Sequence, residues 1–147
     1  MAICLFVVLL VLDQVVKFYV SSNMMPGESI PVVNGVFHIT YVLNPGAAFG
    51  MLEHQRWFFI LAGIVIIGAF CWYYPHLKRQ CAYFHYGCVS LLAGAVGNLI
   101  DRIRSGLVVD FFDFRIWPVF NLADVAIVLG VASMIYAIMV KMKETDE

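Results

Sequence analysis

Two aspartates stand in apolar stretches of the sequence, where a charge is costly. Asp110 lies within Val108–Phe111, and Asp124 closes the stretch Phe120–Asp124. Two carboxylates held close together cannot both ionise, so they share one proton and their pKa values split. One group of such a pair can take a proton from water while the other gives a proton to a carbonyl oxygen and then to a leaving amine. The two residues therefore predict acid–base hydrolysis of a peptide bond.

The surroundings of the two carboxyl groups predict different charge states. Asp124 lies near a predicted helix N-terminus, where the helix dipole stabilises negative charge, and we expect it to be ionised. Asp110 lies among apolar neighbours, and we expect it to hold the proton. A lone aspartate at a helix N-terminus most often caps the helix, so the sequence leaves a purely structural role for Asp124 open.

Further polar residues fall in segments that are apolar enough to cross a membrane, where a charge costs about 2.5–3.5 kcal/mol. Asp13 and Lys17 are four residues apart and face the same side of a helix, so they can pair. This pair either fixes helix packing or takes part in the chemistry.

A polar stripe ends a later apolar segment and continues in the next one. Asn98, Asp101 and Arg102 lie three and four residues apart, with Gly94 one turn before Asn98. Asn121 shares a helix face with the second aspartate, three residues on. Such a stripe either holds helices together or lines a site, and a glycine within it permits close approach of a helix or a ligand.

Other chemistries lack their residue patterns. The histidines have no metal-ligand spacing, the serines have no G-x-S-x-G setting, and the cysteines form no C-x-x-C pair. We therefore expect no metal and no cofactor. The residues concerned are His38, His54, His76 and His85, and Cys4, Cys71, Cys81 and Cys88.

The composition predicts a membrane protein. Of the 147 residues, 63% are hydrophobic and 13% are charged, against about 45–50% and about 25% in soluble domains. Four apolar segments are long enough to cross about 30 Å of hydrocarbon. The predicted fold is an all-α membrane protein: one domain, residues 1–147, built as a four-transmembrane-helix bundle. The predicted spans are residues 3–20, 57–74, 82–100 and 119–140, the last with Pro118 as a start signal.

Residues 21–56 are too polar for a simple connection between spans. Asn34-Gly35 separates two arms rich in β-branched residues, Ile30–Val33 and Val36–Val42. This pattern predicts a β-hairpin with a two-residue type I′ turn, within a small extracytoplasmic sheet.

Basic residues predict the orientation. They are dense in the short segments 75–80 and 141–143, which lie on one side of the membrane and should be cytoplasmic. Both termini then lie in the cytoplasm, with the aspartates at the outer interface. The net charge of −1 and the nine Lys and Arg residues argue against a nucleic-acid partner.

Five segments, in this order, carry a resemblance to a known family. They are Asp13 with Lys17, Asn44–Phe49, Gly94–Arg102, Val108–Phe111 and Phe120–Asp124. Together they resemble bacterial lipoprotein signal peptidase, the signal peptidase II family. The resemblance implies an intramembrane aspartic endopeptidase of the bacterial inner membrane, which cuts a prolipoprotein just before its diacylglyceryl-modified cysteine. It also implies contact with membrane lipid and inhibition by globomycin, and we expect a monomer.

The resemblance further implies roles for individual residues. The family's catalytic aspartates occupy the positions of Asp110 and Asp124. Supporting residues are Asn44, Asn98, Arg102 and Asn121, the first-helix pair Asp13 and Lys17, and Gly94 and Asp101. The chain departs from the usual family pattern at Ala93, where glycine is common, and at Val16, where serine or threonine is common; neither departure touches the aspartates.

Two other functions fit a small polytopic protein. Asp13, Lys17 and the aspartates could form a proton or ion relay, but a relay needs polar groups through the membrane depth. Here Asp101, Asp110 and Asp124 gather at one edge, and the second span has no charged residue. A structural subunit would leave Asp110 and Asp124 unexplained.

Overall fold

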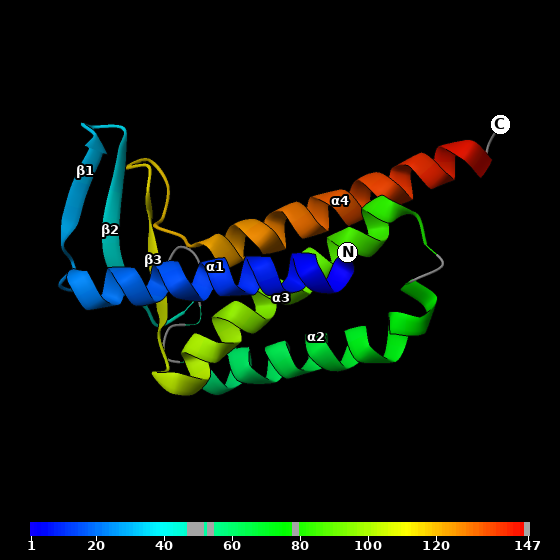
Figure 1. Ribbon diagram of the computed structural model, residues 1–147, viewed down its shortest axis with the longest axis horizontal. Coiled ribbons are helices and arrows are strands. Elements are labelled where there is room, and N and C mark those ends of the chain that lie inside the picture. The colour runs from blue at the N-terminus through cyan, green and yellow to red at the C-terminus, as the bar shows by residue number, and fades with distance from the viewer. Residues whose placement is uncertain (47–51, 53–54, 78–79, 146–147) are drawn as a thin grey trace.

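Four helices form a bundle and a small sheet lies across one end of it (Figure 1). The structure, a computed structural model, describes residues 1–46, 52, 55–77 and 80–145. The helices are α1 (Ala2–Asn23), α2 (Arg56–Leu77), α3 (Ala82–Arg104) and α4 (Leu122–Thr145). The strands are β1 (Ser29–Val33), β2 (Phe37–Asn44) and β3 (Val108–Asp113). The all-α membrane architecture with a small sheet is thus confirmed.

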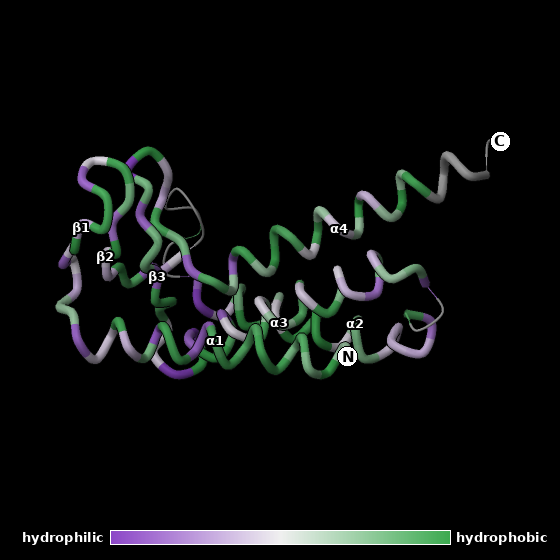
Figure 2. Tube along the Cα trace, turned by 45° about the horizontal axis from the view of Figure 1, so that its top comes forward, coloured by the Kyte–Doolittle hydropathy of each residue, from purple (hydrophilic) through white to green (hydrophobic). Residues whose placement is uncertain are grey.

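The bundle has an apolar exterior, as a bilayer requires. All four helices are long and apolar enough to cross a membrane, and Figure 2 shows hydrophobic residues running along them. The buried residues of α1 are Asp13, Lys17 and Val20, whereas its apolar side chains, such as Ile3 at 75% exposed, point outward. Polar groups inside and apolar groups outside reverse the arrangement of a water-soluble protein.

Helix α3 is the centre of the bundle and packs against α1, α2 and α4. Glycines allow α3 and α4 to touch backbone to backbone. A Cβ atom added at Gly87 would lie 2.7 Å from the carbonyl oxygen of Gly130, and one added at Gly130 would lie 2.6 Å from that of Gly87. A Cβ added at Gly94 would overlap the carbonyl oxygen of Ala123. Small residues at such positions are the usual means of close helix packing in membranes.

The sheet is antiparallel with strand order β1-β2-β3. Strand β2 pairs with β3 through Val42 opposite Asp110 and Asn44 opposite Val108. The sheet is attached to the end of α1 by a buried cluster of Val20, Tyr41 and Phe111. This cluster fixes β3 next to the helices, so Asp110 faces the bundle.

The predicted hairpin turn needs correction. The hairpin turn has three residues between Val33 and Phe37, which pair with each other, and Gly35 has a positive φ of 72° while Asn34 does not. A type I′ turn needs positive φ at both central residues, so the predicted two-residue turn is wrong. The extra residue is accommodated by a register shift between Pro31 and Val33.

Strand β3 was not predicted, because its six residues, Val108–Asp113, do not alternate between apolar and polar side chains. Helix α4 also begins later than Pro118 suggested. Phe120 forms a β-bridge with Phe112, and this extended backbone delays the helix until Leu122. Helix α2 runs through Pro75 to Leu77, past the predicted end of its span at residue 74.

Candidate active site

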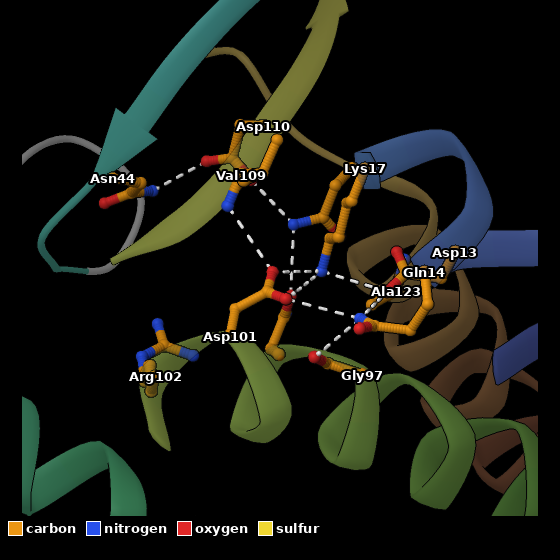
Figure 3. A network of polar contacts seen from close by, with 12 residues as sticks. Asp13, Gln14, Lys17, Asn44, Gly97, Asp101, Arg102, Val109, Asp110 and Ala123 are labelled. Carbon is orange, nitrogen blue, oxygen red and sulfur yellow. Dashed lines mark hydrogen bonds and ion pairs between the residues drawn. The ribbon is translucent and has the colours of Figure 1, made fainter. Parts of the chain in front are cut away.

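Asp110 is held at the inner face of β3 by two asparagines. Its side chain is 1% exposed. Asn121 Nδ2 donates to Asp110 Oδ1 at 2.6 Å, and Asn44 Nδ2 donates to Asp110 Oδ2 at 2.9 Å (Figure 3). The amide of Asn44 is itself fixed, because its Oδ1 accepts the backbone N–H of Gly46 at 2.9 Å. Both oxygens of Asp110 therefore have a directed donor.

The environment of Asp110 favours its protonated form. Burial is the largest influence and the negative charge of Asp124 is the second, and together they raise the pKa of Asp110 from 3.8 to about 7. The hydrogen bonds from Asn44 and Asn121 act in the opposite direction. The carboxyl group can therefore hold a proton near neutral pH.

Asp124 both caps α4 and faces the site. The backbone N–H of Asp124 donates to Asn121 Oδ1 at 2.9 Å, and the backbone N–H of Asn121 donates to Asp124 Oδ2 at 3.2 Å. This reciprocal pair is a capping box. The other oxygen, Asp124 Oδ1, accepts Asn98 Nδ2 at 2.7 Å. The capping role left open by the sequence is therefore present, and one residue combines it with a place in the site.

Asn121 is the link between the two carboxyl groups. It is fully buried and serves both aspartates, Asp110 through its side chain and Asp124 through its backbone N–H. Its Nδ2 also donates to Asn98 Oδ1 at 3.1 Å. Because its Oδ1 is occupied by the helix cap, the amide has one usable orientation. This geometry couples the start of α4 to β3.

Lys17 lies beneath the aspartates in a buried cluster. Its Nζ contacts Asp13 Oδ2 at 2.9 Å, Asp101 Oδ2 at 2.8 Å and Asn98 Oδ1 at 2.9 Å. Asp13 Oδ1 in turn accepts the backbone N–H of Ala123 at 2.9 Å, in the first turn of α4. The predicted Asp13–Lys17 pair is therefore formed, and it joins α1 to α3 and α4.

Gln14 also joins this cluster, although no role for it was predicted from the sequence. Its Nε2 lies 3.2 Å from Asp13 Oδ2, 3.2 Å from the carbonyl oxygen of Gly97 and 3.3 Å from Asp101 Oδ1. Gln14 lies three residues before Lys17 and so shares its helix face. That spacing was the available signal.

Arg102 lies between the end of β2 and helix α2. Its Nη2 donates to the carbonyl oxygen of Gly46 at 3.0 Å, and its guanidinium lies 4.3 Å from the ring centre of Phe59. The stacked ring and the carbonyl fix the side chain in place. Arg102 therefore connects α3 to α2 and to the end of β2. Residues 47–49 of the Asn44–Phe49 motif lie outside the described residues.

A cavity of about 640 Å³ opens at the two aspartates. Its polar wall contains Asn44, Asn98, Arg102, Asp110 and Asp124. The rest is mainly apolar and comes from α2, α3 and α4, including Phe59, Ala62, Ile66, Leu99, Ile127 and Val128. Gly94 is absent from this wall and instead packs against Ala123. The geometry thus separates the glycine, which sets helix spacing, from the residues that face the cavity.

Asp113 shows that position along β3 decides the role of a carboxyl group. Its Oδ2 accepts a hydrogen bond from Thr40 Oγ1 at 2.7 Å and one from Arg115 Nη1 at 2.9 Å. Although burial acts to raise the pKa of Asp113, these hydrogen bonds and the charge of Arg115 hold it below the ordinary value. Asp113 is an ordinary paired carboxylate, unlike Asp110 three residues earlier.

Comparisons with known proteins identify the family of the chain. A model of signal peptidase (SPase) II matches residues 5–140. The chain is 48% identical over 132 residues to a lipoprotein signal peptidase of Pelotomaculum thermopropionicum, covering 90% of this chain and 87% of the relative. It is 45% identical over 130 residues to a lipoprotein signal peptidase of Clostridioides difficile, covering 87% of each chain.

Solved structures agree with the sequence comparisons. A bacterial membrane enzyme determined by the in meso method superposes with a TM-score of 0.91 at 33% identity, covering 97% of this chain and 90% of that one. A second bacterial membrane enzyme gives a TM-score of 0.81 at 34% identity, covering 93% and 91%. Since the match extends over nearly the whole chain in both kinds of comparison, the chain belongs to the signal peptidase II family.

Proposed function

We propose that Asp110 and Asp124 are the catalytic pair with which this member of the signal peptidase II family removes signal peptides from prolipoproteins. The observation that carries the proposal is the shared set of asparagines, which holds both carboxyl groups at the wall of one cavity. The raised pKa of Asp110, at about 7, supports a pair that shares one proton.

The proposed reaction uses each carboxyl group as both acid and base. Ionised Asp124 takes a proton from water as the water oxygen attacks the scissile carbonyl carbon, and Asp110 gives its proton to the carbonyl oxygen. The tetrahedral intermediate then collapses as Asp124 gives its proton to the leaving nitrogen and Asp110 takes back the hydroxyl proton. The carbon–nitrogen bond breaks, one water is consumed, and the pair returns to its starting state.

The supporting residues have distinct proposed roles. Asn44, Asn98 and Asn121 hold the carboxyl oxygens in place, which leaves the carboxyl groups aimed at the substrate. Arg102, whose guanidinium is fixed in the cavity wall, contacts the substrate backbone. Asp13, Lys17 and Asp101 support the asparagines from below, and Gly94 allows the close approach of α4.

The apolar lining of the cavity supports the proposal that the substrate is a lipid-modified signal-peptide precursor. A signal peptide is itself an apolar helix, and the apolar surfaces of α2, α3 and α4 offer a place for it beside the aspartates. The diacylglyceryl chains on the cysteine after the cut can stay in the bilayer, because they are as apolar as the bilayer core. We expect cleavage just before that cysteine, and globomycin is expected to occupy the same cavity.

The proposed location is the bacterial inner membrane, with the site at the outer interface. The N-terminus, the end of α2 and the end of α4 lie at the end of the bundle away from the sheet (Figure 1). The basic residues at 78, 79, 141 and 143 belong to this end by sequence, which supports a cytoplasmic assignment for it. The chain is proposed to act as one domain and as a monomer.

The test is cleavage of a prolipoprotein peptide by the purified full chain, with and without the diacylglyceryl group. We expect the lipidated peptide to be cut before its cysteine and the unlipidated peptide to be cut at least about 100-fold more slowly, since binding energy from the lipid positions the reacting bond. Equal rates would contradict lipid recognition while leaving the aspartic chemistry intact. Cleavage at another bond would contradict the proposed site of the cut.

The pH dependence of kcat/KM follows from Asp110 in the free enzyme. The protonated form is the active one, so kcat/KM should fall as the pH rises through about 7. Asn44→Ala removes a hydrogen bond that lowers the pKa of Asp110, so the alkaline limb should move to higher pH. Losing a hydrogen bond of ~1.5 kcal/mol to a carboxylate corresponds to a shift of about one unit. A pH–rate profile from pH 5 to 10 measures the shift, and a limb that moves to lower pH would refute the assignment.

A further inference from the structure

The ammonium group of Lys17 has one acceptor for each of its three N–H bonds. Asp13 Oδ2, Asp101 Oδ2 and Asn98 Oδ1 lie 2.9, 2.8 and 2.9 Å from Nζ. The side chain is 3% exposed, and an ammonium group has three donors and no acceptor. The Asp13 contact lies within α1 and the Asp101 contact joins α1 to α3 (Figure 3). The third bond goes to the neutral amide of Asn98.

This third bond decides how the amide of Asn98 is oriented. A cation beside Oδ1 excludes the flipped amide, because the flipped NH2 group would point at the ammonium. Asn121 Nδ2 donates to the same oxygen at 3.1 Å, but it also serves Asp110. With Oδ1 held in this way, Asn98 Nδ2 points at Asp124 Oδ1 and donates at 2.7 Å. Lys17 and Asp124 therefore contact opposite ends of one side chain.

We propose that Lys17 is a positioning residue for the catalytic base: through Asn98 it directs an N–H donor onto Asp124 and keeps that carboxylate aimed at the cavity. This inference rests on the proposed function of Asp124. It assigns the Lys17 cluster a second role besides holding α1 against α3.

Gln14 offers a way to separate the two roles. It shares the face of Lys17 on α1 and contacts the same two carboxylates, Asp13 and Asp101. Among the described contacts of Gln14, none reaches Asn98. Loss of Gln14 therefore weakens the connection between the helices without releasing the amide. If the cluster were purely structural, variants of Gln14 and of Lys17 would differ only in stability.

The experiment uses Lys17→Met/Asp101→Asn in the full chain. Removing the cation together with one carboxylate keeps the formal charge of the cluster at −1, since Asp13 alone stays charged. Asp13 keeps the N–H of Ala123 and the amide of Gln14, so no bare charge is left inside the bundle. With the lipidated prolipoprotein peptide, we expect kcat to fall about 10- to 100-fold with KM within about twofold of wild type.

The melting temperature is the second measurement. In Gln14→Met and in Asp101→Asn, which both keep Lys17, kcat should fall much less than in the double variant, even where the melting temperature falls as far. A purely structural role would make the loss of kcat follow the loss of melting temperature in all three variants.

Three outcomes overturn the proposal. They are a double variant whose kcat matches that of Gln14→Met, an Asp101→Asn variant whose kcat falls as far as that of the double variant, and a double variant that does not fold. Each would make Lys17 a structural residue only. Failure of the proposed function is distinguished in the same assay, since wild-type enzyme would then fail to cut the peptide or Asp124→Asn would cut it normally.

Discussion

Asp110→Asn and Asp124→Asn should each lower kcat by about 10³-fold or more, with the protein still folded. Each substitution keeps the shape of the side chain but removes either the proton donor or the base, and general acid–base catalysis contributes about 10²- to 10⁴-fold. The pair acts as a unit, so the double variant should be no slower than either single variant. Initial rates with the lipidated peptide measure the loss.

Asp113→Asn is the matched control for the pair. Asp113 lies on the same strand as Asp110, but it bonds Thr40 and Arg115 and does not line the cavity. We expect its kcat to stay within about twofold of wild type. If Asp113→Asn were as slow as Asp110→Asn, the loss would come from damage to β3 and the catalytic assignment would fail.

A comparison of wild type with Asp110→Asn also tests the raised pKa of Asp110, without any substrate. The ordinary pKa of an aspartate is 3.8, and that of Asp110 in the folded chain is about 7. Between these two pH values the folded chain binds the proton of Asp110 more tightly than the unfolded chain does. The extra stability is fully present below 3.8 and is lost as the pH rises through about 7. The melting temperature of wild type should therefore fall from pH 5 to pH 8 more steeply than that of Asp110→Asn. Equal slopes would contradict the shift.

Gly94→Ala should damage both stability and catalysis, although Gly94 does not line the cavity. The new Cβ atom would overlap the carbonyl oxygen of Ala123, so α3 and α4 must move apart. Overpacking costs about 1–3 kcal/mol. Because Ala123 directly precedes Asp124, the shift displaces the proposed catalytic base, and a misplacement of about 1 Å can cost about 100-fold in rate. We expect a lower melting temperature and a kcat reduced by about that factor.

Gly68→Ala is the control for this prediction. Gly68 lies in α2, and nothing lies within 4 Å of a Cβ atom added there. Alanine is favoured over glycine by about 1 kcal/mol in a helix interior, so Gly68→Ala should be neutral or stabilising with unchanged kcat. Equal behaviour of the two variants would show that the close approach of α3 and α4 does not position Asp124.

The sequence predicted local features well, because these depend on neighbours along the chain. The helix spacing of Asp13 and Lys17 predicted a pair, which the structure contains. The apolar segments predicted four spans, since each backbone in a bilayer must satisfy its own hydrogen bonds. The position of Asp124 near a helix N-terminus predicted a cap, which is present in reciprocal form with Asn121.

Contacts between segments that are distant along the chain could not be predicted from the sequence. Strand β3 forms because β2 and Phe120 offer its backbone partners, and none of these is visible in the pattern of Val108–Asp113 itself. Gln14 looked unremarkable until α3 was placed beside it. Gly94 resembled a member of a site-lining stripe, yet its neighbour proved to be the backbone of α4.

By itself, the sequence determined that the chain is a membrane bundle and which aspartates could share a proton, because hydropathy and residue type are properties of the chain alone. Only the tertiary structure decided that Asn121 serves both carboxyl groups and that Lys17 reaches Asn98, 81 residues away. The physical reason is that hydrogen bonds have a range of about 3 Å and a required direction. Only the packed helices and sheet bring these donors and acceptors within that range.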